Sequence, residues 1–304
     1  MPKTLEIHDL PDVFRGSEAR KAGLITEAEL RGHSVRRLFQ DVYTLAHVEV
    51  THELRCRGAA LIVPKEAVLT GRSAATVLGV ELAQPLDPVE FVVPEEFRFG
   101  PIKGIHVRRT DVTTAESKPW HDARIATKPR IALDLMLRLS PRTRGWIRRL
   151  RIGVPDLDAF LRAFPISDFL LHYMFYGRRN RGIIIARQAL NLSDPRAESL
   201  PESELRIVTL VGGFCVEPQL KVFKGKKFLG RLDLGIEESK VAIEYDGRRW
   251  HGTPEQIAHD RQRRRRMEAE GWVFVIVTAE QLATDYATIL ERIGVADERS
   301  RLAG

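Results

Sequence analysis

Alternating helical and strand-like periods run through the first fifty residues. Residues 17–24 have a helical pattern that ends at Gly23, and Thr26 with Glu29 forms the capping-box spacing that begins a second helix. Residues 35–39 and 42–45 then alternate as two strands. Two short helices followed by a hairpin is the layout of a winged helix-turn-helix, which we predict for residues 1–50. The pattern also fits a small helical subdomain that serves only for packing.

The middle of the chain predicts a second small domain and a helical region. Residues 85–120 mix proline, glycine and β-formers, which indicates short strands, and Ile131, Leu135 and Leu139 recur at helical spacing. Residues 192–203 contain two prolines and three serines and are typical of a domain boundary. We predict a connecting α/β domain at 51–150, a helical linker region at 151–195, a third domain at 196–290 and a tail at 291–304.

The third domain follows the order helix, strand, hairpin, helix, strand. Strands at 228–236 and 240–245 are joined by the turn 237–240, and a polar helix leads to an apolar strand at 272–277 that suits the centre of a covered sheet. If Ile236 pairs with Val241, Asp233 lies opposite Glu244, and strand alternation places Asp246 on the same face. The pattern predicts an α/β protein, α+β overall, whose last domain has a mixed central sheet flanked by helices.

Three carboxylates on one sheet face repel one another, and a hard divalent cation removes that penalty. Mg²⁺ or Mn²⁺ held by such oxygens activates water and stabilises in-line displacement at phosphorus, which is the chemistry we expect here. The alternative is that Asp246 belongs only to a turn and that Asp233 pairs with an arginine such as Arg231 or Arg248.

Charge favours a nucleic-acid partner, and composition excludes several other classes. The 304 residues contain 48 Lys+Arg and 41 Asp+Glu, a net charge of +7, and arginines cluster at 138–151, 178–187 and 261–266. A solvated basic surface is the alternative explanation.

Two cysteines cannot form a four-thiolate zinc site or a disulfide framework. The sequence has neither a secretory signal pattern nor an apolar run of about 18 residues, so we expect a cytoplasmic protein that does not enter a membrane.

Several segments of the last hundred residues carry a family resemblance. ESLPESELR (198–206), FLGRLDLG (228–235) and KVAIEYDGRRWHGTPEQIAHDRQRRRRMEAEGWVFVIVTAEQL (240–282) resemble the very-short-patch-repair-like branch of PD-(D/E)XK endonucleases, and more narrowly the domain-of-unknown-function 559 proteins. The resemblance covers about residues 183–285 and implies a restriction-endonuclease-like core.

The resemblance implies a role for each matching residue. Glu202, Asp233, Glu244 and Asp246 take the catalytic acidic positions, with Asp233, Glu244 and Glu202 as metal ligands. His251, Asp260 and Arg264 fall where these domains carry polar residues that orient water or contact phosphate. The lysine of the (D/E)-x-K pattern is absent, because the triplet here is Glu244-Tyr245-Asp246. Either another basic group replaces it, or the domain is weakly active or only binds DNA.

The N-terminal half has a looser resemblance to another family. HDLPDVFRGSEARKAGLITEAEL (8–30), LFQDVYTL (38–45), AVLTGRSAATVLGV (67–80) and IATKPRIALDLMLRL (125–139) are similar to AbiEi-family antitoxins of type IV toxin–antitoxin systems. This resemblance implies a winged-helix DNA-binding head followed by a small connecting domain. For DNA contacts we single out Arg20, Lys21, Arg36 and Arg37 in this half, and Arg248, His251, Arg261, Arg264 and Arg265 in the last domain.

Together these observations predict a DNA-binding protein with a Mg²⁺- or Mn²⁺-dependent endonuclease domain. They leave open whether the protein acts in repair, in defence or in toxin–antitoxin control. They also leave open which toxin or repair partner it has, if any. The alternative is a non-catalytic, antitoxin-like regulator that binds DNA through its winged helix. An RNA-directed nuclease is a third hypothesis, which comparison of matched DNA and RNA substrates distinguishes.

Overall fold

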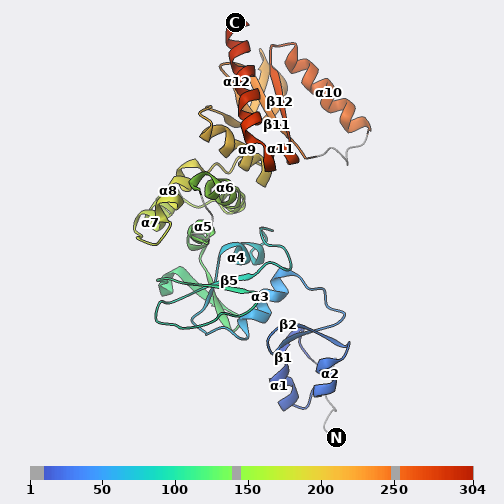
Figure 1. Cartoon of the computed structure of the whole chain (residues 1–304), viewed down its shortest axis with the longest axis vertical. Coiled ribbons are helices and arrows are strands. Elements are labelled where there is room, and N and C mark those ends of the chain that lie inside the picture. Colours follow the sequence, from blue (N-terminus) through green and yellow to red (C-terminus); the bar gives the residue numbers. More distant parts are fainter. Residues whose placement is uncertain (1–9, 139–144, 248–253, 304) are drawn as a thin grey trace. The chain divides into compact units, whose positions relative to one another are not determined.

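The chain folds into two compact units (Figure 1). The computed structural model describes residues 10–138, 145–247 and 254–303. Among these, 10–138 and 166–183 form the N-terminal unit, and 145–165 and 184–303 form the C-terminal unit. Both units combine helices with a sheet, so the predicted α/β class is confirmed.

The N-terminal unit begins with two short helices and a three-stranded antiparallel sheet of order β1-β3-β2. These elements are β1 (Val13–Arg15), α1 (Gly16–Lys21), α2 (Glu27–Arg31), β2 (Val35–Phe39) and β3 (Val42–Leu45). The Thr26 hydroxyl accepts from the Glu29 N–H at 3.2 Å, and the Glu29 carboxylate accepts from the Thr26 N–H at 2.7 Å. The predicted capping box is therefore confirmed, and it fixes the start of α2.

The rest of this unit is a five-stranded mixed sheet of order β6-β5-β4-β8-β7 with helices. Its elements are α3 (His52–Ala60), β4 (Val68–Leu69), α4 (Gly71–Val77), β5 (Val89–Val93), β6 (Ile105–Arg109), η2 (Thr114–Glu116), β7 (Ser117–Trp120), β8 (Ala123–Ala126), α5 (Lys128–Leu137) and α7 (Asp168–Tyr176). The fully buried Arg130 binds Asp134 at 2.9 Å and Glu116 at 2.8 Å, so its charge is compensated inside this unit.

The C-terminal unit is built on a four-stranded sheet of order β12-β11-β10-β9. Its elements are α6 (Trp146–Ala163), α8 (Ile183–Leu192), α9 (Leu200–Val211), β9 (Glu217–Lys224), β10 (Lys227–Ile236), β11 (Val241–Asp246), α10 (Pro254–Glu268), β12 (Val273–Thr278), α11 (Ala279–Thr284) and α12 (Tyr286–Ala303). Strands β11 and β12 are parallel and the other two pairs are antiparallel, so the sheet is mixed.

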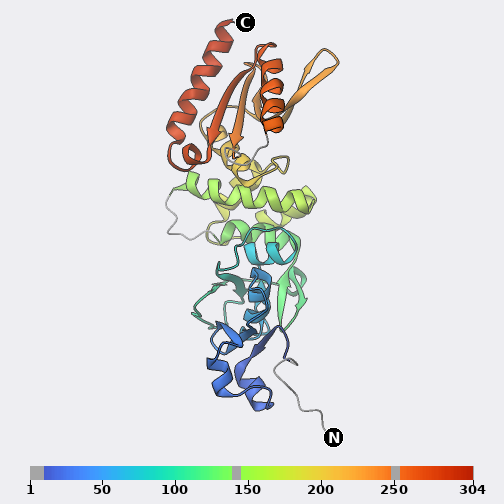
Figure 2. The ribbon, with the colours of Figure 1, turned by 90° about the vertical axis from the view of Figure 1, so that its right-hand side faces the viewer.

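Helices cover both faces of this sheet, with α12 on one side and α10 on the other (Figures 1 and 2). On the first face, Leu205 of α9 and Ile293 of α12 belong to the same buried cluster as Ile243 of β11. On the second face, Met267 of α10 packs in a cluster with Ala242. The site described below lies on the α10 side, because Glu244 follows Ala242 by two residues and therefore shares its face.

One strand differs in position from the expectation. The apolar segment 272–277 was expected at the centre of the sheet, but β12 is an edge strand. Its apolar residues are explained by burial on both faces, since Val275 and Val277 join the α12-side cluster and Phe274 packs on the α10-side cluster. Arg292 donates to the Ile276 carbonyl at 3.1 Å and so occupies part of the free edge.

Two predicted domain boundaries fall within helices. The boundary at 150/151 lies inside α6, and the boundary at 290/291 lies inside α12, so neither is a break in secondary structure. In the described residues, no helix combines the length and apolar character needed to cross a bilayer.

Candidate functional site

The hairpin formed by β10 and β11 has the predicted register. Ile236 pairs with Val241, and Leu234 pairs with Ile243. The paired residues end there, and the next residue, Asp233, accepts a hydrogen bond from the Tyr245 N–H at 3.0 Å through its own carboxylate. Asp233 is thereby fixed beside the Glu244–Tyr245 peptide of the neighbouring strand.

Asp233 lies in an environment that disfavours its negative charge. The side chain is half-buried, and the pKa of Asp233 is raised from 3.8 to about 6, with burial as the largest cause. The neighbouring Glu202 and Glu244 carboxylates contribute to this rise, while the Tyr245 N–H and the Arg263 guanidinium oppose it. Three of the four predicted catalytic acids therefore interact electrostatically, although they come from α9, β10 and β11.

Two arginines of α10 neutralise Glu244. This carboxylate is only 4% exposed, and its oxygens accept from Arg263 at 2.7 Å and from Arg264 at 3.1 Å. Arg263 also donates to the Arg231 carbonyl at 2.6 Å, so its guanidinium is held between β10 and β11. Buried charges require such partners, and here arginines supply the positive charge.

Gly230 lets α10 approach the sheet this closely. A Cβ at this position would lie 2.2 Å from the Met267 methyl and 3.1 Å from Arg263 Cγ. The absence of a side chain in β10 therefore makes room for the turn of α10 that contributes Arg263 and Met267.

Glu202 is fixed at the N-terminus of α9. Its carboxylate accepts from the Ser199 hydroxyl at 2.8 Å, the Glu198 N–H at 2.9 Å and the Gln219 amide at 2.9 Å. These three donors therefore fix the Glu202 carboxylate at the first turn of α9.

Asp246 is the last residue of β11 and pairs with Thr278 of the parallel strand β12. It is half-buried, and strand alternation places it on the Glu244 face. The predicted DNA contacts Arg248 and His251 lie outside the described residues. Asp260 is half-buried on α10, with an oxygen 4.0 Å from the Arg263 Nε.

The donor chemistry of this site suits the predicted metal. Asp233, Glu244 and Glu202 offer only carboxylate oxygens, the ligands that Mg²⁺ and Mn²⁺ prefer. In the described part of the chain, no three His, Cys, Asp or Glu side chains are close enough together to hold an ion. Glu244 must exchange at least one of its arginines before it can act as a ligand.

The arginines predicted to contact DNA differ in how far they are engaged within the protein. On α10, Arg261 and Arg265 are exposed, whereas Arg264 is bound to Glu244. In the N-terminal unit, Arg20 pairs with Glu27 at 2.5 Å and Lys21 is exposed in the last turn of α1.

The remaining two predicted contacts lie on β2. Arg36 donates to the Ala46 and Val48 carbonyls, and Arg37 donates to the Phe39 carbonyl at 3.1 Å. Both residues remain exposed.

Arg263 was not among the predicted site residues, although it binds Glu244 as the predicted Arg264 does and also donates to the Arg231 carbonyl. The available signal was its spacing of four residues from Met267, the one methionine in a helix that is otherwise polar toward its C-terminus. Residues four apart share a helix face, so the buried Met267 marks the side of α10 that faces the sheet.

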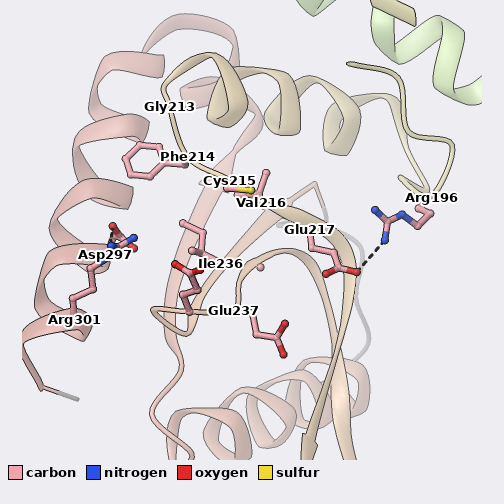
Figure 3. A pocket seen from close by; sticks show the side chains of 12 residues that line it. Arg196, Gly213, Phe214, Cys215, Val216, Glu217, Ile236, Glu237, Asp297 and Arg301 are labelled. Atoms are coloured by element: carbon pink, nitrogen blue, oxygen red, sulfur yellow. Dashed lines mark hydrogen bonds and ion pairs between the residues drawn. The ribbon is translucent and has the colours of Figure 1, made fainter. Parts of the chain in front are cut away.

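A separate pocket of about 700 Å³ lies near the β10–β11 turn (Figure 3). It is lined by Phe214, Cys215 and Glu237 among others, and by none of the predicted catalytic acids. Its arginines form ion pairs, Arg196 with Glu217 at 3.0 Å and Arg301 with Asp297 at 3.1 Å. The acidic site is therefore distinct from this pocket.

Comparisons with known proteins give relatives without an assigned activity. No family model matches the chain. The chain is 30% identical over 160 residues to uncharacterized protein MT2308 of Mycobacterium tuberculosis (strain CDC 1551 / Oshkosh) and to uncharacterized protein Rv2248 of M. tuberculosis (strain ATCC 25618 / H37Rv). Each match covers 52% of this chain and 59% of the relative's length. Among solved structures, the RV2827C protein from M. tuberculosis matches with a TM-score of 0.40 and 18% identity, over 72% of this chain and 86% of that one.

Proposed function

We propose that the C-terminal unit is a metal-dependent endonuclease domain that hydrolyses phosphodiester bonds in DNA. The observation that carries this proposal is the electrostatic interaction of Asp233 with Glu202 and Glu244, because burial and then these two carboxylates raise the pKa of Asp233. Acids whose pKa is shifted by burial and by neighbouring charges mark a candidate functional site. The resemblance to PD-(D/E)XK endonucleases supports the same assignment.

Asp233 and Glu244 would hold Mg²⁺ or Mn²⁺, together with Glu202 or Asp246. When bound, the metal supplies an activated water and neutralises charge that develops on the phosphate. The Tyr245 N–H orients Asp233, and the α9 N-terminus orients Glu202. Arg263 lies beside the acids and supplies the positive charge that the missing lysine of the (D/E)-x-K pattern would otherwise bring.

Nicking of supercoiled plasmid by the full chain tests the proposal. We expect cutting that requires Mg²⁺ or Mn²⁺, and loss of cutting in both Asp233→Asn and Glu244→Gln. Glu238→Gln is the matched control, because this exposed carboxylate lies in the turn of the same hairpin. Metal-independent cutting, or full cutting by Asp233→Asn, would contradict the proposal.

One observation favours the second candidate, a non-catalytic antitoxin-like regulator. Both oxygens of Glu244 are engaged by arginines, which is an arrangement that is stable without a metal. Under this alternative, the wild type cuts neither plasmid DNA nor RNA with either metal, and Asp233→Asn retains salt-sensitive DNA binding.

A further inference from the structure

The hairpin of β9 and β10 extends beyond the rest of its sheet (Figure 2). Its strands are joined by a two-residue turn, Gly225–Lys226, in which Gly225 has φ +57°. Next to the turn, Lys224 pairs with Lys227 and Phe223 pairs with Phe228. Positive φ in a two-residue turn matches the twist of antiparallel strands, so the tip has a defined geometry.

The phenylalanine pair faces solvent although the hairpin already has a buried side. Phe223 is 52% exposed and Phe228 is 55% exposed, and their ring centroids are 5.5 Å apart. The neighbouring Val222 and Leu229 are buried and provide the contact with the core. The two rings are therefore not needed to anchor the hairpin, and their exposure at a projecting tip indicates an interaction surface.

The charge around these rings is entirely positive along the hairpin. Between residues 218 and 232 the sequence has no acidic residue and has five basic ones: Lys221, Lys224, Lys226, Lys227 and Arg231. Lys224 pairs with Glu270, and Arg231 pairs with Glu198 at 2.8 Å. Within the described residues, Lys226 and Lys227 are exposed and form no ion pair.

We propose that this tip is a DNA-binding arm, in which lysines contact phosphates of a duplex and the phenylalanine pair packs against base edges or an opened base step. A two-stranded ribbon fits a DNA groove, and exposed apolar side chains at such sites insert between base steps. This inference rests on the proposed function, because the same strand that carries Phe228 also carries Asp233.

Phe228 and Asp233 lie close together along β10. They are five positions apart, which is at most about 17 Å of extended strand, and a register shift between Phe228 and Gly230 shortens this length. At 3.4 Å per base pair this is about five base pairs. The arm and the acidic site therefore share one strand, with the rings on the face opposite Val222 and the α10 side. A flat lipid surface gives no reason for the two features to share a strand.

Fluorescence anisotropy with a labelled 30-base-pair duplex tests the arm in the full chain. The measurement is made in EDTA, so that binding is observed without cutting. For Phe223→Ser/Phe228→Ser we expect about tenfold weaker binding at each salt concentration, since contacts between bases and aromatic rings contribute about 1–3 kcal/mol. For Lys226→Ala/Lys227→Ala we expect the slope of log K against log[salt] to become shallower by about 2.

The control variants are Leu86→Ser, an apolar residue that is 83% exposed, and Lys65→Ala/Lys118→Ala, two exposed lysines of the N-terminal unit. Unchanged thermal unfolding excludes a folding defect in the arm variants. Wild-type affinity and salt slope in both arm variants would overturn the inference. So would unchanged duplex binding together with lost binding to phosphatidylglycerol vesicles.

Plasmid nicking in Mg²⁺ separates this inference from the proposed function. Loss of duplex binding in the arm variants, with no cutting by the wild type, supports the arm and contradicts the nuclease. Metal-dependent cutting by the wild type, with unaffected binding by the arm variants, supports the nuclease and overturns the arm.

Discussion

Replacement of Asp233 by asparagine should stabilise the C-terminal unit while it abolishes cutting. The amide keeps an oxygen that can accept from the Tyr245 N–H, but it removes a negative charge from a half-buried position next to two glutamates. An acid whose pKa is raised on folding stabilises the folded state only where it is protonated. The free energy that the protonated acid contributes to folding is present in full below 3.8, its pKa in the unfolded chain. It is lost as the pH rises to about 6, its pKa in the folded protein.

The size of the gain follows from that shift. A rise from 3.8 to about 6 corresponds to about 3 kcal/mol above pH 7. Because Asp233 is only half-buried, solvent screening reduces this, and we expect Asp233→Asn to gain about 1–2 kcal/mol at pH 8. At pH 4.5 the folded wild type is mostly protonated at this position, so the gain should fall to about a third of its value at pH 8.

Urea unfolding followed by tryptophan fluorescence measures this difference in metal-free buffer. A Trp120→Phe background leaves tryptophans only after residue 145, so the emission reports on the C-terminal unit. Glu238→Gln is the control and should leave stability unchanged at both pH values, because its carboxylate is exposed. A variant that is no more stable than wild type at pH 8, or a gain that does not depend on pH, would contradict the raised pKa of Asp233.

Three further predictions concern stability. Arg206→Met should cost about 3 kcal/mol at pH 8 in urea unfolding, because it leaves the buried Asp158, now 2.7 Å from Arg206, without its counter-charge. Burial raises the pKa of Asp158 to about 6, so the cost should be smaller at pH 5, and an equal cost would contradict that shift. Thr26→Ala should lower the stability of the N-terminal unit by about 1 kcal/mol, measured by Trp120 emission, whereas Thr26→Ser should not. Ile243→Ala should cost about 2–5 kcal/mol in calorimetry, because the side chain is fully buried, and a cost below 1 kcal/mol would show that the core collapses around it.

The hairpin that carries the acids could be predicted because its information is local. A short turn fixes the register of two strands, and a period of two then decides which side chains share a face. The pairing of Ile236 with Val241 was predicted on this basis and is confirmed. The capping box of Thr26 and Glu29 was predictable for the same reason, since both partners lie within one turn of helix.

The features that were missed depend on tertiary packing. The sequence shows that α10 is rich in arginine, but only the packing of Met267 on β10 determines that Arg263 reaches Glu244 while Arg261 faces solvent. The edge position of β12 was missed because helices on both faces make an edge strand as apolar as a central one. Alternation also predicts which hairpin residues face outward, but not that Phe223 and Phe228 would extend beyond the sheet.

The path of the chain between the two units has a consequence for genetic dissection. The N-terminal unit takes residues 10–138 and then 166–183, while 145–165 belongs to the C-terminal unit. No single truncation therefore yields either unit whole, and an isolated unit requires excision of an internal segment and a new junction. During synthesis, α7 emerges from the ribosome only after α6, so the N-terminal unit acquires its last helix when part of the other unit already exists. A crossover at any single point between residues 138 and 184 would separate the two stretches of at least one unit. Intact units therefore require that the two be inherited together.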